Sequence, residues 1–221
     1  MVVQRVQTSP AVPPARRVDL ADDAAFDDLL PLSLQLKSSV HFTPIDVARH
    51  AARLLAPRPG MSVLDVGAGV GKFCLAAALA LPRASFVGAE WRPHLVSVAR
   101  RIASEAQQTN ARFVAVDALD LDWSHYDAFY FYNPFAEQLF DSELALDRTI
   151  DLDAINFVRY ATAVRHRLAH ARLGTRVVTY HGYGAPIPPG YELVHADAIG
   201  SDRVELWIKT RVIAIEAERP Q

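Results

Sequence analysis

The fold is decided by one short stretch of the sequence, Val63-Leu64-Asp65-Val66-Gly67-Ala68-Gly69-Val70-Gly71. The apolar residues up to Val66 predict a short buried strand, and the three glycines at alternate positions predict a tight turn into a helix. Glycine lets a ligand approach bare backbone, and the N-terminus of the next helix offers unpaired N–H groups. The stretch therefore predicts a ligand site between a strand and a helix.

The spacing of the glycines separates three kinds of nucleotide site. A phosphate-binding P-loop needs glycine at position 66 and serine or threonine at position 73, where this chain has Val66 and Phe73. A dinucleotide fingerprint needs glycine or alanine at position 72, which is Lys72. The P-loop is therefore excluded, whereas the dinucleotide site is weakened and stays an alternative.

Strands and helices alternate downstream of this turn. Predicted strands are Ser62–Val66, Ser85–Ala89, Arg112–Val116, Ala128–Tyr132 and Thr175–Tyr180, and predicted helices are Gly71–Leu81, Pro93–Gln107 and Asp153–Ala171. The segments Glu192–His195 and Arg203–Ala214 are expected to form an antiparallel pair at the edge. The pattern predicts an α/β fold: a single Rossmann-like, doubly wound, mostly parallel seven-stranded sheet with helices on both faces and an antiparallel C-terminal edge pair.

Three parts are expected along the chain. Residues 1–20 are rich in proline and arginine and predict a flexible arm, residues 21–56 predict N-terminal helices that act as a lid, and residues 57–221 form the main domain. Within the lid, helices are expected at Ala21–Leu30 and Pro44–Leu55, with Thr43 as N-cap of the second.

Composition narrows the class of protein. The 221 residues are 51% hydrophobic and 22% charged with a net charge of −2, which is typical of a globular protein and disfavours a dedicated nucleic-acid binder. The single cysteine excludes an internal disulfide and a cysteine-rich zinc site. No secretory signal or membrane span is found, so we expect a soluble cytoplasmic protein. No metal site is expected, because the His166–His170 pair is interpreted as a surface helix face.

With its D-x-G-x-G-x-G motif at Val63 to Gly71, the chain resembles the class I S-adenosylmethionine-dependent methyltransferases from about Phe42 onward. The resemblance implies S-adenosyl-L-methionine as cofactor. It also implies that the turn passes under the methionine part of the cofactor, and that Asp65 orders the site around the amino group. The turn residues concerned are Gly67, Ala68, Gly69 and Gly71.

Two acids follow the next strands of the predicted sheet. Glu90 lies about 20 residues beyond the glycine turn, where a carboxylate can accept hydrogen bonds from ribose hydroxyls. In the family that the chain resembles, an acid placed like Asp117 accepts from the adenine amine, and the backbone at Ala118 completes the recognition. The alternative is that both acids only cap the following helices. Trp91 is a candidate to pack against adenine, with plain packing as the alternative.

The resemblance also gives Thr43-Pro44 a role. The pair is similar to the Thr-Pro element that amino-directed methyltransferases place over the cofactor carboxylate, which makes Thr43 a candidate cofactor ligand. An ordinary N-cap followed by proline is the alternative.

The predicted acceptor end is Asn133-Pro134-Phe135. It resembles the (Asn/Asp)-Pro-Pro-aromatic motif of nitrogen methyltransferases, with one proline instead of two. It is also similar to the Asn-Asn-Phe-Ala segment of histone-lysine methyltransferases of this fold. The resemblance implies that Asn133 and a proline carbonyl hold the target N–H groups beside the cofactor, while the aromatic ring stacks on the acceptor. The alternative is that Asn-Pro simply ends a strand.

Other polar residues are weaker candidates for the acceptor site. The acidic segment 136–151 is interpreted as a solvated face, or as a rim that attracts a cationic amine. His181 is the candidate base.

The sequence thus predicts an S-adenosylmethionine-dependent methyltransferase directed at nitrogen, on a protein side chain or a small molecule. Nucleic acid is disfavoured as the acceptor, and the oligomeric state is left open. Two alternatives remain on the same fold. One is a non-catalytic cofactor-binding regulatory or interaction module. The other is a different enzyme, such as an aminopropyltransferase or an NAD(P) oxidoreductase.

Overall fold

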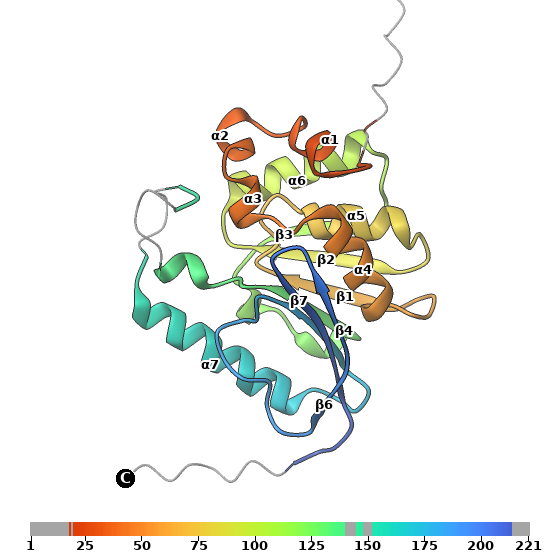
Figure 1. Cartoon of the computed structure of the whole chain (residues 1–221), viewed down its shortest axis with the longest axis vertical. Helices are drawn as coiled ribbons and strands as arrows, with labels where there is room; N and C mark the ends of the chain where they lie inside the picture. Colours follow the sequence, from red (N-terminus) through yellow and green to blue (C-terminus); the bar gives the residue numbers. More distant parts are fainter. Residues whose placement is uncertain (1–17, 19, 140–144, 148–151, 214–221) are drawn as a thin grey trace, which may run out of the picture.

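The computed structural model describes residues 18, 20–139, 145–147 and 152–213 (Figure 1). Its centre is a seven-stranded sheet of order β3-β2-β1-β4-β5-β7-β6. Strand β7 runs in the opposite direction to the other six, so its pairings with β5 and β6 are antiparallel and the remaining pairings are parallel. The strands are β1 (Ser62–Val66), β2 (Ser85–Glu90), β3 (Ala111–Ala115), β4 (Ala128–Tyr132), β5 (Arg176–Tyr180), β6 (Tyr191–Ile199) and β7 (Asp202–Lys209). The predicted Rossmann-like, mostly parallel sheet with an antiparallel edge pair is confirmed.

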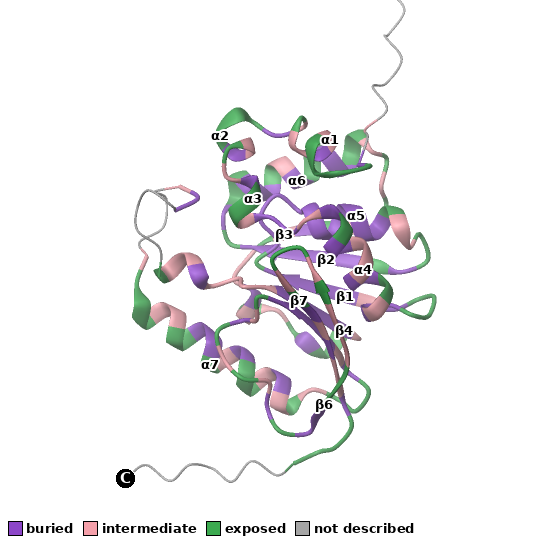
Figure 2. Cartoon of the chain, viewed as in Figure 1, coloured by how far each residue is buried: buried purple, intermediate pink, exposed green. Residues whose placement is uncertain are grey.

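Helices cover both faces of the sheet. One core cluster joins the sheet to α4 (Ile45–Leu55), α5 (Lys72–Ala80) and α6 (Pro93–Glu105), and a second joins the opposite face to α7 (Ala154–His170). Figure 1 shows α7 alone across the sheet from the other helices. Helix α5 is buried almost throughout, because small and apolar residues follow Lys72 without a polar face (Figure 2). None of the described helices is long and apolar enough to cross a membrane.

The N-terminal segment departs from its prediction. The expected helix 21–30 is only α1 (Asp23–Asp27), and two short helices follow it, α2 (Leu32–Gln35) and α3 (Ser38–His41). The predicted N-cap of α4 is also wrong, and Asp23 explains why. Its carboxylate accepts from the Ile45 N–H at 3.0 Å, so the N-terminus of α4 is capped from α1, whereas Thr43 is not the cap.

Lys72 links the N-terminal helices α1 and α3 to the main domain. Its ammonium is buried and pairs with Asp23 at 2.8 Å and Asp27 at 3.0 Å, and it also donates to Ser38. These contacts explain why a charged residue opens a buried helix. The predicted flexible arm lies outside the described residues apart from Val18 and Leu20, and the role of residues 21–56 as a lid stays a prediction.

The edge hairpin also differs from its prediction. Strand β6 extends to Ile199, four residues beyond the predicted end, and β7 ends at Lys209 rather than at Ala214. The register shifts between Leu193 and His195, which marks a β-bulge at Val194. Alternating patterns predict strands poorly where such a bulge breaks the alternation.

Gly71 combines a left-handed backbone with close packing against a buried ring. Its φ is +78°, and a Cβ there would meet the Phe113 ring at 2.5 Å. Gly60 has a similar φ of +82° with nothing within 4 Å of the same position. We expect Gly71→Ala to lower the free energy of unfolding by about 1–3 kcal/mol more than Gly60→Ala, because only Gly71 adds overpacking to backbone strain. Denaturant melts of the two variants measure this difference, and equal losses would contradict the packing role.

Candidate active site

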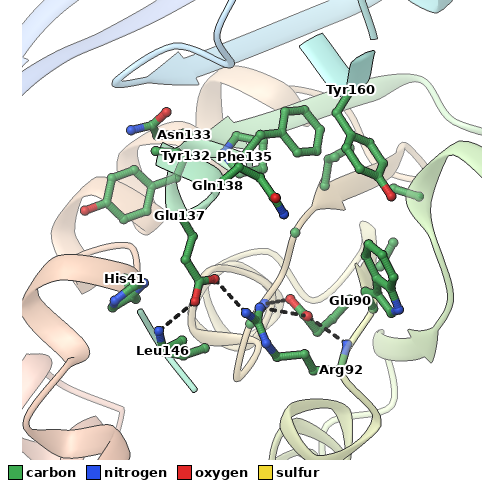
Figure 3. Close-up of a pocket in the computed structure, with 18 of the residues that line it drawn as sticks. His41, Glu90, Arg92, Tyr132, Asn133, Phe135, Glu137, Gln138, Leu146 and Tyr160 are labelled. Atoms are coloured by element: carbon green, nitrogen blue, oxygen red, sulfur yellow. Dashed lines mark hydrogen bonds and ion pairs between the residues drawn. The ribbon is translucent and has the colours of Figure 1, made fainter. Parts of the chain in front are cut away.

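A cavity of about 270 Å³ opens at the carboxyl ends of the parallel strands (Figure 3). Its walls come from the turns after β1, β2, β4 and β5, from the segment after β3, and from α3 and α7. In an open α/β sheet, ligands bind at this edge, where the strand order reverses. Here the reversal lies between β1 and β4. Its lining includes nine predicted site residues: Gly67, Gly69, Glu90, Trp91, Asp117, Ala118, Asn133, Pro134 and Phe135.

The glycine turn forms the floor of this cavity. A Cβ on Gly67 would lie 2.9 Å from the Pro134 Cβ, and one on Gly69 would lie 3.0 Å from the Phe42 ring. Both neighbours are themselves cavity-lining residues, so larger side chains here would fill the site. Gly71, in contrast, faces Phe113 and is not among the lining residues. Of the three glycines, two are therefore placed to meet a ligand, and the third serves packing.

Glu90 connects the turn after β2 to the glycine turn. Its carboxylate accepts from the Gly69 N–H at 3.0 Å and from the Arg92 N–H at 2.9 Å. Burial raises the pKa of Glu90, while the Arg92 and Gly69 N–H groups and the Arg92 charge oppose that rise. Each carboxylate oxygen accepts one of these bonds and retains acceptor capacity toward the cavity.

A buried arginine that the sequence reasoning missed organises the rim. Arg92 pairs with Glu137 at 2.8 Å and with Asp147 at 3.2 Å, and it lies 3.9 Å from Glu90 (Figure 3). Glu137 also accepts from the Leu146 N–H. In the acidic rim predicted to attract a cationic amine, Glu137 and Asp147 are therefore both paired with Arg92. Its other predicted acids, at 141, 143 and 151, lie outside the described residues.

Asp117 is held between its own turn and α7. Its carboxylate accepts from the Leu119 N–H at 2.9 Å, as a cap, and from the Tyr160 hydroxyl at 2.6 Å. Tyr160 also stacks on Phe135, with ring centroids 5.0 Å apart, and lies 6.3 Å from Trp91. Phe135, expected to stack on the acceptor, thus has a protein partner on one face. These aromatic rings form an apolar wall beside Asp117 and Ala118.

Asn133 occupies a strained turn after β4. Its φ is +41°, its N–H donates to the Gly182 carbonyl, and its own carbonyl accepts from the Ala136 N–H. Asparagine tolerates this left-handed conformation better than most residues. Within the described part of the chain no hydrogen bond engages its side-chain amide, which Figure 3 places at the cavity wall.

Asp65 and Thr43 lie apart from the main cavity. Both line a small neighbouring hollow of about 20 Å³, together with Ala68 and Gly67. The Cys74 thiol donates to Asp65 at 3.6 Å, and the Tyr130 hydroxyl donates to Thr43 at 3.2 Å. Burial raises the pKa of Asp65 from 3.8 to about 8. Gly67 borders both spaces, so a ligand that crosses this glycine could reach both.

His181 lines the cavity, but its ring is already engaged. Its Nε2 lies 3.0 Å from the Ser201 hydroxyl, and its Nδ1 lies 3.3 Å from Asp202. A base needs a free nitrogen lone pair directed at the substrate. Both nitrogens face the β6–β7 turn instead, which argues against the predicted role as a base.

Several lining residues were not singled out from the sequence, among them His41, Arg92 and Tyr160. Tyr160 lies in the middle of an amphipathic helix, where a tyrosine is normally interpreted as core. Arg92 follows Glu90 by two residues, and this proximity was the only available indication that it belongs to the site.

A comparison with known families finds a similar domain in the middle of the chain. A family model described as "Methyltransferase domain" matches residues 57–154, from before β1 to the start of α7. The match includes the glycine turn, both strand-end acids and Asn133. Residues 57–154, somewhat less than half of the chain, are therefore similar to a methyltransferase domain. The match leaves the N-terminal helices and the edge hairpin outside this domain model.

Solved structures of methyltransferases share the fold of this chain. An RNA methyltransferase from Salinibacter ruber, in complex with S-adenosyl-L-homocysteine, is 21% identical with a TM-score of 0.56 over 80% of this chain and 99% of that one. Magnesium protoporphyrin IX methyltransferase from Synechocystis PCC 6803, with bound S-adenosylmethionine, is 16% identical with a TM-score of 0.51 over 92% and 87% of the two chains.

One curated relative is not a methyltransferase. A probable D-xylulose reductase A from Neosartorya fischeri is 33% identical over 92 residues, which are 41% of this chain and 26% of the reductase. The match thus spans about a quarter of that protein. Because of this match, we retain the dinucleotide-binding site as an alternative to be tested.

Proposed function

We propose that the chain is an S-adenosylmethionine-dependent methyltransferase that acts on a nitrogen acceptor. The observation that carries this proposal is the single cavity that joins Gly67 and Gly69, the acids Glu90 and Asp117, and Asn133 with Pro134. The two glycines and the two acids offer contacts for a nucleoside ligand, and Pro134 lies against Gly67 of the same turn.

The residues present fit the proposed cofactor. Glu90 retains acceptor capacity toward the cavity for the two ribose hydroxyls. The rings of Trp91, Phe135 and Tyr160 give an apolar wall for adenine beside Asp117. Asp65 lies next to Gly67 and supplies a carboxyl group for the amino end. The solved neighbours with S-adenosyl-L-homocysteine or S-adenosylmethionine bound support the same choice.

Bound S-adenosylmethionine supplies an electrophilic methyl group on a sulfonium. The chain's part is to hold the nucleophile in line with that group, and positioning of this kind carries much of the rate enhancement. The Asn133 amide oxygen accepts from the acceptor N–H, because its side chain has no other partner among the described residues and its backbone is fixed by Gly182 and Ala136. A neutral amine needs no strong base, which fits a His181 ring engaged elsewhere.

Asn133→Gly tests the acceptor role without adding backbone strain, since glycine tolerates a φ of +41°. We expect kcat to fall at least about tenfold, because the nucleophile loses its orienting partner, while S-adenosylhomocysteine affinity stays within about twofold. The measurement is methyl transfer from labelled S-adenosylmethionine together with a binding titration. Loss of cofactor affinity with unchanged kcat would contradict the role.

The acceptor class is tested with the wild-type chain and labelled methyl donor. Parallel incubations contain small primary amines, a mixture of unmodified peptides with lysine and glutamine, or transcribed RNA. We expect the amine or peptide incubation to take up label and the RNA to take up none, since the net charge of −2 gives little attraction for phosphate. Label in RNA alone would overturn the acceptor proposed here.

The reductase relative favours one second candidate, an NAD(P) oxidoreductase. Lys72 opposes it, because the dinucleotide fingerprint needs glycine or alanine at this position for close helix packing. Here the Lys72 ammonium lies against Asp23 and Asp27. The affinities for S-adenosylhomocysteine and NAD separate the two functions.

A further inference from the structure

Three metal-ligating side chains converge on the edge of the sheet, away from the cavity. His50 comes from α4, and His195 and Asp197 come from β6. The Asp197 Oδ2 atom lies 3.1 Å from the His50 Nε2 and 2.7 Å from the His195 Nε2. The three ligand atoms all lie within 4.8 Å of one another.

The β-bulge at Val194 places two of them. Beyond the bulge, His195 pairs with Leu206 and Asp197 pairs with Val204. Paired residues of neighbouring strands point to the same face of a sheet, and both partners belong to the core cluster that α4 covers. Without the extra residue, His195 and Asp197 would point to the opposite face. The bulge therefore turns both side chains toward His50, on the helix that lies beside the hairpin in Figure 1.

The polar contacts within the cluster are incomplete. The buried Nε2 atom of His50 makes no hydrogen bond of good geometry within the described residues, although a carboxylate oxygen lies 3.1 Å away. That one oxygen faces two imidazole nitrogens at once. Ligands of tetrahedral zinc, at bond lengths near 2.0–2.1 Å, lie about 3.4 Å apart. Small side-chain rotations would therefore fit the three atoms around an ion.

We propose that His50, His195 and Asp197 form a binding site for a divalent transition metal ion of the zinc class, which clips the edge hairpin to α4. Two imidazoles with one carboxylate select zinc, nickel or cobalt over magnesium and calcium, which prefer all-oxygen sites. The side chains are 28%, 37% and 44% exposed in that order, which leaves water access for the remaining coordination position. The proposal does not rest on the proposed methyl transfer.

The test uses the full chain after dialysis against a chelator. We expect titration with cobalt(II) to give the visible absorption bands of a bound ion at one equivalent, and zinc to displace it. His195→Ala and Asp197→Asn should each weaken the affinity at least about tenfold, since changes even to the partners of metal ligands cost that much. Circular dichroism checks that each variant is folded.

His170→Ala is the matched control, because His166 and His170 are a second pair of neighbouring histidines, exposed one turn apart on α7. We expect this variant to bind like the wild type. Binding lost in His170→Ala but kept in His195→Ala would move the ion to α7 and overturn the proposal. Absence of a one-equivalent complex with the wild type would equally overturn it, and would leave the cluster as a hydrogen-bonded His-Asp-His group.

Discussion

Replacing Glu90 by glutamine is expected to weaken the binding of S-adenosylhomocysteine by about a hundredfold or more. In the proposed complex its carboxylate accepts from two ribose hydroxyls, and each hydrogen bond to a charged group is worth about 1.5–3 kcal/mol. A loss of about 3 kcal/mol corresponds to a factor above 100 in the dissociation constant. The amide keeps the shape of the side chain, but only one of its two polar atoms can accept.

The binding loss must be separated from damage to the turn, because Glu90 also accepts from Gly69 and Arg92. Glu105→Gln is the matched control, since it neutralises an exposed carboxylate paired with Arg101 on α6. Calorimetric titration of both variants and of the wild type, with circular dichroism beside it, gives the comparison. A folded Glu90→Gln variant that binds S-adenosylhomocysteine like the wild type would contradict the ribose role.

The second large effect is the dependence of folding stability on pH that Asp65 causes. Burial raises the pKa of Asp65 from 3.8 to about 8, so between these values the folded protein holds a proton that the unfolded chain has released. The contribution of Asp65 to the free energy of unfolding is therefore fully present below pH 4. It is lost as pH rises toward 8, by about 1.4 kcal/mol per pH unit. An asparagine at this position carries no titratable proton, so the variant Asp65→Asn has no such slope.

We therefore expect the Tm difference between Asp65→Asn and the wild type to grow in favour of the variant as pH rises. Between pH 5 and pH 7.5 the change is on the order of 3 kcal/mol, or roughly 10 °C for a domain of this size. Asp46→Asn is the control, because it changes an aspartate side chain that is 90% exposed. Its effect should stay within about 0.5 kcal/mol at each pH. If the Tm difference between Asp65→Asn and the wild type did not change with pH, this would contradict the claim that the buried carboxyl group is protonated.

Local signals made the central sheet predictable. Short apolar runs broken by glycine and proline predicted each parallel strand, and the first glycine turn indicated the ligand edge. Glu90 and Asp117 could be placed because the carboxyl ends of parallel strands meet at one edge of a sheet. Asn133 followed from the same rule.

Contacts between distant elements could not be predicted in this way. The cap of α4 comes from Asp23 rather than from the adjacent Thr43, and the partner of Asp117 is Tyr160, from the middle of α7. Arg92 gathers Glu137 and Asp147 only after the chain has folded around it. His195 reaches the face of α4 only through a bulge that no alternating pattern indicates.

The central claim is tested most directly by titrating the purified chain with S-adenosylhomocysteine and NAD in parallel, with Tm and calorimetry as readouts. A ligand that binds only the folded state adds about 2.7 kcal/mol at a hundredfold excess over Kd, which raises Tm by several degrees. The account predicts one site for S-adenosylhomocysteine and no shift with NAD. A shift with NAD alone, or with neither ligand, would contradict it.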